Sequence, residues 1–304
     1  MKKRNCLIWI LICAVLLLFS GCQLTQNGDS SLTSAHSNRK PQRKRSEVRS
    51  AFKINQPVAD EEEDYEDYEN DADDSDNTDE TESQQIEGIT ATEDSYDYVA
   101  LGNSITCNEV DDSLWWGSWG MAASSEEKDY VHLVAKWLGN QTLKEVNTTV
   151  LDLKEWEVAQ KRDSLLSNYA EYFDENTNLV TIQTGENITE YKDTLNQDYS
   201  ALVKFIKEKA PNAQILMLGE MLWPSEDIEA AKKAACKEHN ITFIEMTTFL
   251  NGYESSYKSA LNTEVAGADG KQHKISNEVV AAHPNDAGME CIYQSVINNI
   301  SLYN

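Results

Sequence analysis

Tyr98-Val-Ala-Leu-Gly-Asn-Ser-Ile-Thr106 is the stretch of this 304-residue sequence that decides the fold. Its first half is apolar, as in a buried strand, and it breaks at Gly102 into a polar turn that presents Ser104. A serine in such a turn is a weak signal alone, because Gly-Asn-Ser turns are common. Two further turns stand in comparable places. Gly185-Glu-Asn187 follows an apolar run, and His283-Pro-Asn-Asp-Ala-Gly288 precedes an apolar-striped segment near the C-terminus.

Strand and helix patterns alternate from residue 96 onward. We expect strands at 98–102, 144–151, 179–184, 214–219 and 241–246. Helices are expected from a capping box at 124–127 to Gly139, and at 157–173, 195–210, 226–239 and 288–302. Strict alternation of this kind indicates an α/β fold with a parallel sheet covered on both faces. The sequence thus predicts a flavodoxin-like three-layer α/β/α sandwich with a five-stranded parallel sheet.

The expected fold brings the distant turns together. In a flavodoxin-like sheet the first and third strands flank the switch point, where ligands bind at the carboxyl ends of the strands. Ser104 ends the first predicted strand and Asn187 follows the third. Both should therefore lie in one crevice.

Ser, Gly, Asn and His in this order resemble the SGNH (GDSL-type) hydrolase family, over about residues 96–304. The resemblance implies a serine esterase or acylhydrolase that needs no metal or cofactor. It implies Ser104 as nucleophile, His283 as base, and Asn187 as an oxyanion donor beside the backbone N–H of Ser104. Gly102, Asn103 and Gly185 would shape the two turns.

Three departures from the family pattern are visible. Asn103 stands where the family usually has Asp, and the second block, after the second predicted strand, has no glycine. Val280 replaces the acid expected three residues before His283. A backbone carbonyl could orient the imidazole instead, or Asp286 or Glu220 could supply the acid. The alternative is a catalytically weak or inactive glycan-binding protein on the same fold.

Tryptophans follow two of the predicted strands, and they bear on the substrate. Indoles at the rim of a crevice stack on sugars or line acyl pockets, although they also fill cores under long loops. An acylated carbohydrate carrying acetyl or other short acyl groups is the expected substrate, and acyl transfer onto a surface polysaccharide would use the same chemistry. The possible substrate-lining residues are Trp115, Trp116, Trp119 and Trp223.

The first 21 residues read as a lipoprotein signal peptide. A positive start is followed by an apolar segment of signal-peptide length and by Phe19-Ser-Gly-Cys22, which resembles a bacterial lipobox. Cys22 would then carry the lipid anchor, such as palmitate, although an ordinary signal peptide or an uncleaved anchor helix is the alternative. We expect an extracytoplasmic protein held at the bacterial cell membrane.

Residues 22–95 form the second expected region, a disordered tether before the hydrolase domain at 96–304. They are polar, with basic residues between 39 and 53 and then an acidic run from 60 to 87 without a basic residue. The basic block could attract anionic headgroups while the acidic block extends the linker, or both could only keep the tether solvated. The net charge of −26 and the absence of a basic domain argue against a nucleic-acid partner.

Overall fold

The computed structural model describes residues 95–302. Five strands form one sheet, β1 (Tyr96–Gly102), β2 (Val146–Asp152), β3 (Thr177–Ile182), β4 (Gln214–Leu218) and β5 (Thr242–Ile244). They are all parallel, in the order β2-β1-β3-β4-β5. This is the flavodoxin-like order, so the predicted fold class is confirmed. The expected signal peptide, Cys22 and the expected tether lie outside the described residues.

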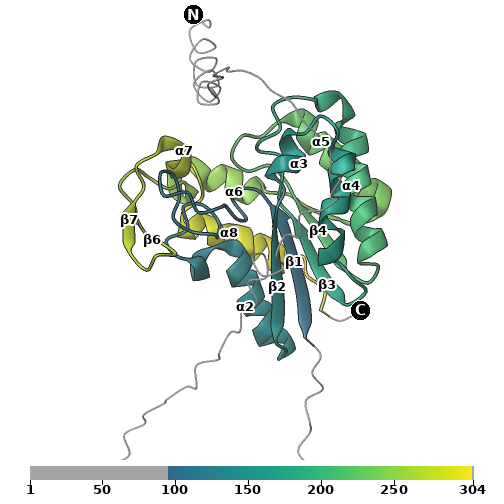
Figure 1. Cartoon of the computed structure of the whole chain (residues 1–304), viewed down its shortest axis with the longest axis horizontal. Helices are drawn as coiled ribbons and strands as arrows, with labels where there is room; N and C mark the ends of the chain where they lie inside the picture. The colour runs from purple at the N-terminus through teal and green to yellow at the C-terminus, as the bar shows by residue number, and fades with distance from the viewer. Residues whose placement is uncertain (1–94, 303–304) are drawn as a thin grey trace, which may run out of the picture. The chain divides into compact units, whose positions relative to one another are not determined.

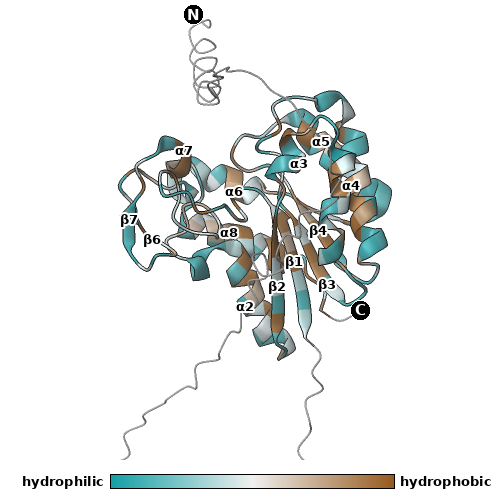
Figure 2. Cartoon of the chain, in the orientation of Figure 1, coloured by the Kyte–Doolittle hydropathy of each residue, from teal (hydrophilic) through white to brown (hydrophobic). Residues whose placement is uncertain are grey.

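Two hydrophobic cores lie on opposite faces of the sheet, because alternate residues of β1 point in opposite directions. Tyr98 and Ala100 belong to the core under α2 (Tyr130–Thr142) and α8 (Asp286–Ile297). Val99 and Leu101 belong to the other, under α4 (Leu195–Lys209) and α5 (Glu226–His239). Figure 1 shows α2 and α8 on one side of the sheet and α4 and α5 on the other. In Figure 2 the apolar residues gather on the central strands.

The prediction of a single helix over 157–173 is wrong. A short helix α3 (Lys154–Val158) ends there, and a 3-10 stretch, η2 (Arg162–Tyr172), takes its place. Only Arg162 and Leu166 of η2 are buried, so this segment lacks the apolar stripe that holds a long α-helix against a sheet.

The helix start expected from Ser124 to Glu127 is also corrected. Residues Glu126–Lys128 form a single 3-10 turn, η1, and Ser125 makes no side-chain cap. Helix α2 begins instead after Asp129, whose carboxylate accepts the N–H of His132. It continues past Gly139 to Thr142, and Leu143 closes it in the left-handed region.

The region between β5 and α8 contains elements that the sequence patterns did not predict. Helix α6 (Thr247–Gly252) leads into a π-helical turn, η4 (Tyr253–Tyr257). Strands β6 (Glu264–Ala266) and β7 (Gln272–Lys274) form an antiparallel hairpin, and helix α7 (Glu278–Ala281) follows. None of the helices within residues 95–302 has the length and apolar character needed to cross a membrane.

Candidate active site

Ser104 lies in a tight turn at the carboxyl end of β1. Thr106 and Cys107 donate their N–H groups to the carbonyl of Asn103, at 2.8 and 2.9 Å, and so close the turn. Gly102 is required before it, since a Cβ there would meet Thr106 Oγ1 at 1.9 Å. Within the described part of the chain, the backbone N–H of Ser104 donates to no acceptor. That N–H is thus available as an oxyanion donor.

His283 meets the serine directly. Its Nε2 lies 2.7 Å from Ser104 Oγ, and its Nδ1 lies 2.8 Å from the backbone carbonyl of Val279. A carbonyl can only accept, so Nδ1 carries the proton and Nε2 of the neutral ring accepts from the serine hydroxyl. Burial lowers the pKa of His283 to about 4, although the Val279 bond acts in the opposite direction. The ring is therefore a neutral base at pH 7.

Short elements around α7 and α8 hold the histidine in place. Asn277 caps α7, and Asn285 caps α8 on the other side of His283. Ser259 donates its N–H to the carbonyl of His283 at 2.9 Å, and Tyr253 donates its hydroxyl to Ala282 O at 2.6 Å. The π-helical turn that carries Tyr253 is thus hydrogen-bonded to the residue before His283.

Neither carboxylate proposed to support His283 reaches it. Asp286 accepts the N–H and the hydroxyl of Ser124, at 2.8 and 2.7 Å, and Glu220 pairs with Lys232 at 2.6 Å. Val280 is buried in the apolar core. Asp286 and Glu220 are therefore corrected as candidates, and the backbone carbonyl of Val279 is the group that orients the imidazole.

Gly185 and Asn187 lie in the turn after β3. Gly185 has φ +128°, and a Cβ there would meet Glu220 Oε1 at 2.1 Å. The amide Nδ2 of Asn187 donates to Glu157 Oε2 at 2.6 Å. The Gly-x-Asn block thus rests on a carboxylate that sequence reasoning missed.

Glu157 is 0% exposed. Its Oε1 accepts from Asn103 Nδ2 at 3.0 Å, from Thr184 Oγ1 at 2.8 Å, and from the N–H of Gly185. The sequence predicted Glu157 as the first residue of a helix over 157–173. A charged residue directly after Trp156 carries no motif, so only the fold could reveal this cluster of contacts.

Buried carboxylates also explain why residue 103 is Asn, where the SGNH pattern usually has Asp. Its Nδ2 donates both to Glu157 and to Glu186 Oε2, the latter at 2.8 Å. Gln183 donates to the same oxygen of Glu186 at 2.8 Å. Burial raises the pKa of Glu186 and the Glu157 carboxylate adds to the rise, although Lys232 acts in the opposite direction. An aspartate at 103 would set a third carboxylate against these two, whereas the amide donates to both.

The family's second block follows the second strand. In this chain, the two backbone N–H groups that follow β2 already have acceptors. Leu153 donates its N–H to Gly102 O at 2.6 Å, and Lys154 donates its N–H to Asp152 Oδ1 at 2.7 Å. The oxyanion donors that the site offers are therefore the N–H of Ser104 and the amide of Asn187.

The four tryptophans separate into different roles. Trp115 and Trp119 are buried in the core and pack edge to face, at 6.0 Å between ring centroids. They do not line the site, which corrects the expectation for both. Trp116 stacks on His273 of β7 at 4.4 Å. Trp223 is 41% exposed and lies edge-on to His283 at 6.4 Å, so it is the indole beside the serine–histidine pair.

A second buried charge cluster lies behind the Gly185 turn. Lys232, fully buried, donates to Glu220 Oε1 and, at 3.1 Å, to Leu218 O. Burial raises the pKa of Glu220 to about 7, with Glu186 adding to the rise and Lys232 opposing it. No group of three or more His, Cys, Asp or Glu side chains between residues 95 and 302 is arranged to hold a metal ion.

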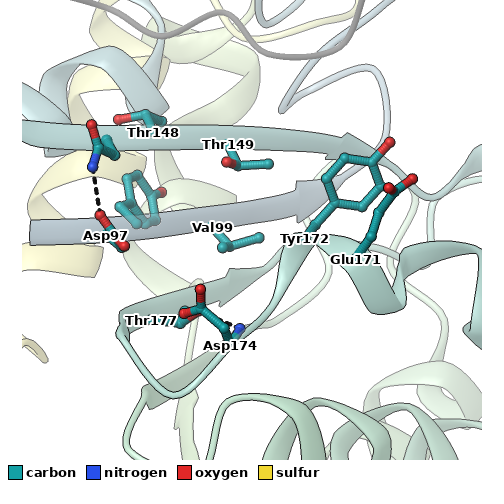
Figure 3. Close-up of a pocket in the computed structure, with 10 residues that line it drawn as sticks. Asp97, Val99, Thr148, Thr149, Glu171, Tyr172, Asp174 and Thr177 are labelled. Atoms are coloured by element: carbon teal, nitrogen blue, oxygen red, sulfur yellow. Dashed lines mark hydrogen bonds between the residues drawn. The ribbon is translucent and has the colours of Figure 1, made fainter. Parts of the chain in front are cut away.

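A separate hollow lies over β1 and β2 beside η2, and Figure 3 shows it. It has an empty volume of about 710 Å³, partly open to solvent, and Asp97, Thr149, Glu171 and Tyr172 are among the residues that line it. Ser104, Asn187 and His283 are not among them. We therefore assign this hollow no part in the chemistry.

Known proteins resemble this chain at low sequence identity. No protein-family model matches this sequence, and no curated protein matches it. Solved structures do. The extracellular lipase from Streptomyces rimosus is 18% identical, with 68% of this chain and 100% of that chain covered and a TM-score of 0.45. Phospholipase A1 from Streptomyces albidoflavus is 14% identical, covering 67% and 99%, with a TM-score of 0.43. A two-domain esterase active on acetylated mannans is 15% identical, covering 67% and 48%, with a TM-score of 0.43.

The strand order and the block residues can be set beside the pattern that the sequence resembles. A serine after β1, Gly-x-Asn after β3 and a histidine before the last helix meet at the switch point of a 2-1-3-4-5 sheet. The resemblance to SGNH (GDSL-type) hydrolases seen in the sequence thus extends to the strand order and to the Ser104–His283 contact. The site carries a backbone carbonyl in place of the triad acid.

Proposed function

We propose that this protein is an extracytoplasmic serine esterase that removes short acyl groups from a carbohydrate through Ser104 and His283. The observation that supports it most is the 2.7 Å contact between Ser104 Oγ and the neutral Nε2 of His283. A serine hydroxyl becomes a strong nucleophile only when a positioned base removes its proton.

The proposed reaction follows from these contacts. Ser104 Oγ attacks the acyl carbon as its proton passes to His283 Nε2, and the negative oxygen accepts from Ser104 N–H and Asn187 Nδ2. The carbon–oxygen ester bond then breaks, and the imidazolium returns the proton to the leaving sugar hydroxyl. Water, deprotonated by His283, releases the acyl group from Ser104 as a carboxylic acid. A polysaccharide hydroxyl in place of water would make the same chemistry a transfer.

Trp223 supports the proposed sugar substrate, and the N-terminal segment supports the proposed location at the membrane. Trp223 presents an exposed indole beside His283, and such a surface suits stacking against a sugar ring. The apolar N-terminal segment and Phe19-Ser-Gly-Cys22 support export and a lipid anchor at the cell membrane.

The test is hydrolysis of p-nitrophenyl acetate by the full chain in detergent, beside Ser104→Ala and His283→Ala. Each substitution should lower kcat by at least about a thousandfold, because nucleophile and base act as one unit. A fluorophosphonate probe should add its mass to the wild type and not to Ser104→Ala. Release of acetate from acetylated polysaccharides would then identify the substrate.

If the wild type matches Ser104→Ala in rate and in labelling, the protein is not an esterase. The buried Val280 in place of the triad acid would then favour the alternative, a glycan-binding protein on a hydrolase fold. Binding of the same polysaccharides, with and without their acetyl groups, would test that alternative.

A further inference from the structure

Glu157 is a buried carboxylate that the proposed reaction does not use. Its two oxygens accept from a side chain of the nucleophile turn, Asn103, and from three residues of the turn after β3, Thr184, Gly185 and Asn187. One side chain thus connects the two turns that carry the oxyanion donors.

No cation neutralises this carboxylate within residues 95–302. Arg162 is adjacent, but it donates to the backbone carbonyl of Glu157, at 2.9 and 3.2 Å, and its ion pair is with Asp198 at 2.8 Å. Burying a charge that only hydrogen bonds compensate is costly, and packing alone does not require it. The donors that bind this carboxylate all come from the two turns of the candidate site, so we look for its role there.

We infer that Glu157 is a positioning residue that fixes the amide of Asn187 for the oxyanion; this inference rests on the proposed function. A carboxylate can only accept, so it holds the NH2 side of Asn187 toward itself and excludes the flipped amide. Because the amide is planar, holding one N–H fixes the direction of the other. The same carboxylate secures the N–H of Gly185, two residues earlier.

Glu157→Gln tests this at nearly constant side-chain volume. The glutamine offers an NH2 group where the carboxylate offered an oxygen, so Asn187 is free to turn its carbonyl toward it. We expect kcat for p-nitrophenyl acetate to fall by on the order of a hundredfold with KM nearly unchanged, as for other small misplacements of a catalytic group. An unchanged kcat would overturn the inference.

A double-mutant cycle with Asn187→Ala separates positioning from a general structural effect. Asn187→Ala should lower kcat by roughly a hundredfold to a thousandfold, as the loss of one oxyanion donor does. If Glu157 acts through Asn187, adding Glu157→Gln should lower kcat by no more than about threefold further. If the fold-losses in kcat of the two single variants multiply in the double variant, Glu157 does not act through this amide.

Asp198→Asn is the matched control, since it also converts a nearly buried carboxylate to an amide and breaks the ion pair to Arg162. It should lower the melting temperature but leave kcat within about twofold of wild type. If Glu157→Gln does not fold, Glu157→Asp keeps the charge but withdraws it by one methylene, and should show the same selective loss of kcat. An active wild type with unaffected Glu157 variants overturns this inference alone, whereas a wild type no faster than Ser104→Ala overturns the proposed function.

Discussion

His283 donates from Nδ1 to the carbonyl of Val279, where a triad would place a carboxylate. The carbonyl selects the same tautomer as a carboxylate does, but it carries no full charge to stabilise the imidazolium. The ring is also buried. Together these features favour the neutral base and make its protonated form costly.

The pH dependence of the reaction should show this. Because burial lowers the pKa of His283 to about 4, kcat/KM should stay level from pH 8 to about 5 and fall only near pH 4. Initial rates with a chromogenic ester, beside circular dichroism at each pH, would measure it. A midpoint near 6.5 would contradict the buried, carbonyl-bound histidine.

The same group affects folding stability in a defined direction. The unfolded histidine binds a proton near pH 6.5, and the folded one only near 4, so this group lowers stability as the pH falls between these values.

Trp223 should affect binding rather than chemistry. Trp223→Ala removes the exposed indole beside His283, so KM for the acylated glycan should rise roughly threefold to tenfold with kcat nearly unchanged. Trp116→Ala, whose ring stacks on His273 instead, is the control and should leave KM as it is. Steady-state kinetics of both variants decide it, and an equal rise in KM for both would contradict the assignment of Trp223.

At the scale of elements, the turn after β3 depends on a glycine in two ways. Gly185 has φ +128°, and a Cβ there would collide with Glu220. Gly185→Ala should therefore lower both the free energy of unfolding and kcat, since the turn carries Asn187.

Gly270 supplies a matched control for this substitution. It also has a positive φ, +75°, but no atom lies within 4 Å of an added Cβ. Gly270→Ala should cost about 1 kcal/mol and leave kcat unchanged. Urea unfolding and ester hydrolysis of both variants measure the difference, and similar losses would argue against the collision at Gly185.

Apolar patterning was sufficient for the strands of the large sheet and for helices α4 and α5, because these elements bury continuous apolar stripes. It failed at η2, which buries little, and at the β6–β7 hairpin, whose strands are three residues long. Sequence reasoning brought Ser104, Asn187 and His283 to one edge of the sheet. It also named a backbone carbonyl as one group that could orient His283, but it could not say that the carbonyl is that of Val279. It could not find Glu157, because a lone glutamate has no sequence pattern.

At the scale of the whole molecule, buried charge behind the site adds a pH-dependent contribution to stability. The folded pKa of Glu220 is about 7, above its ordinary 4.5, so the folded state binds this proton more tightly. The contribution of Glu220 is therefore most favourable below about pH 4.5 and is lost as the pH rises through 7. Its direction is opposite to that of His283.

Lys232→Met should expose this effect, because it leaves the Glu220 carboxylate buried without its cation. We expect a loss of about 3–5 kcal/mol in the free energy of unfolding at pH 8, and a smaller loss at pH 5.5, where Glu220 can take up a proton. Lys233→Met is the control. Lys233 is partly exposed, pairs with Glu229 and Glu245, and should cost at most about 1 kcal/mol at either pH. Urea unfolding of both variants at the two pH values measures it, and equal losses for the two lysines would contradict the burial of this pair.

The direction of β1 determines the edge of the sheet at which the preceding chain enters the domain. The described chain enters β1 at Tyr96, and Ser104 follows the opposite end of the same strand. Seven residues at about 3.3 Å each separate the two edges of the sheet by roughly 20 Å. Any attachment made through the chain that precedes Tyr96 would therefore join the domain at the edge of the sheet away from Ser104. The edge that carries the serine and His283 would stay accessible to a substrate.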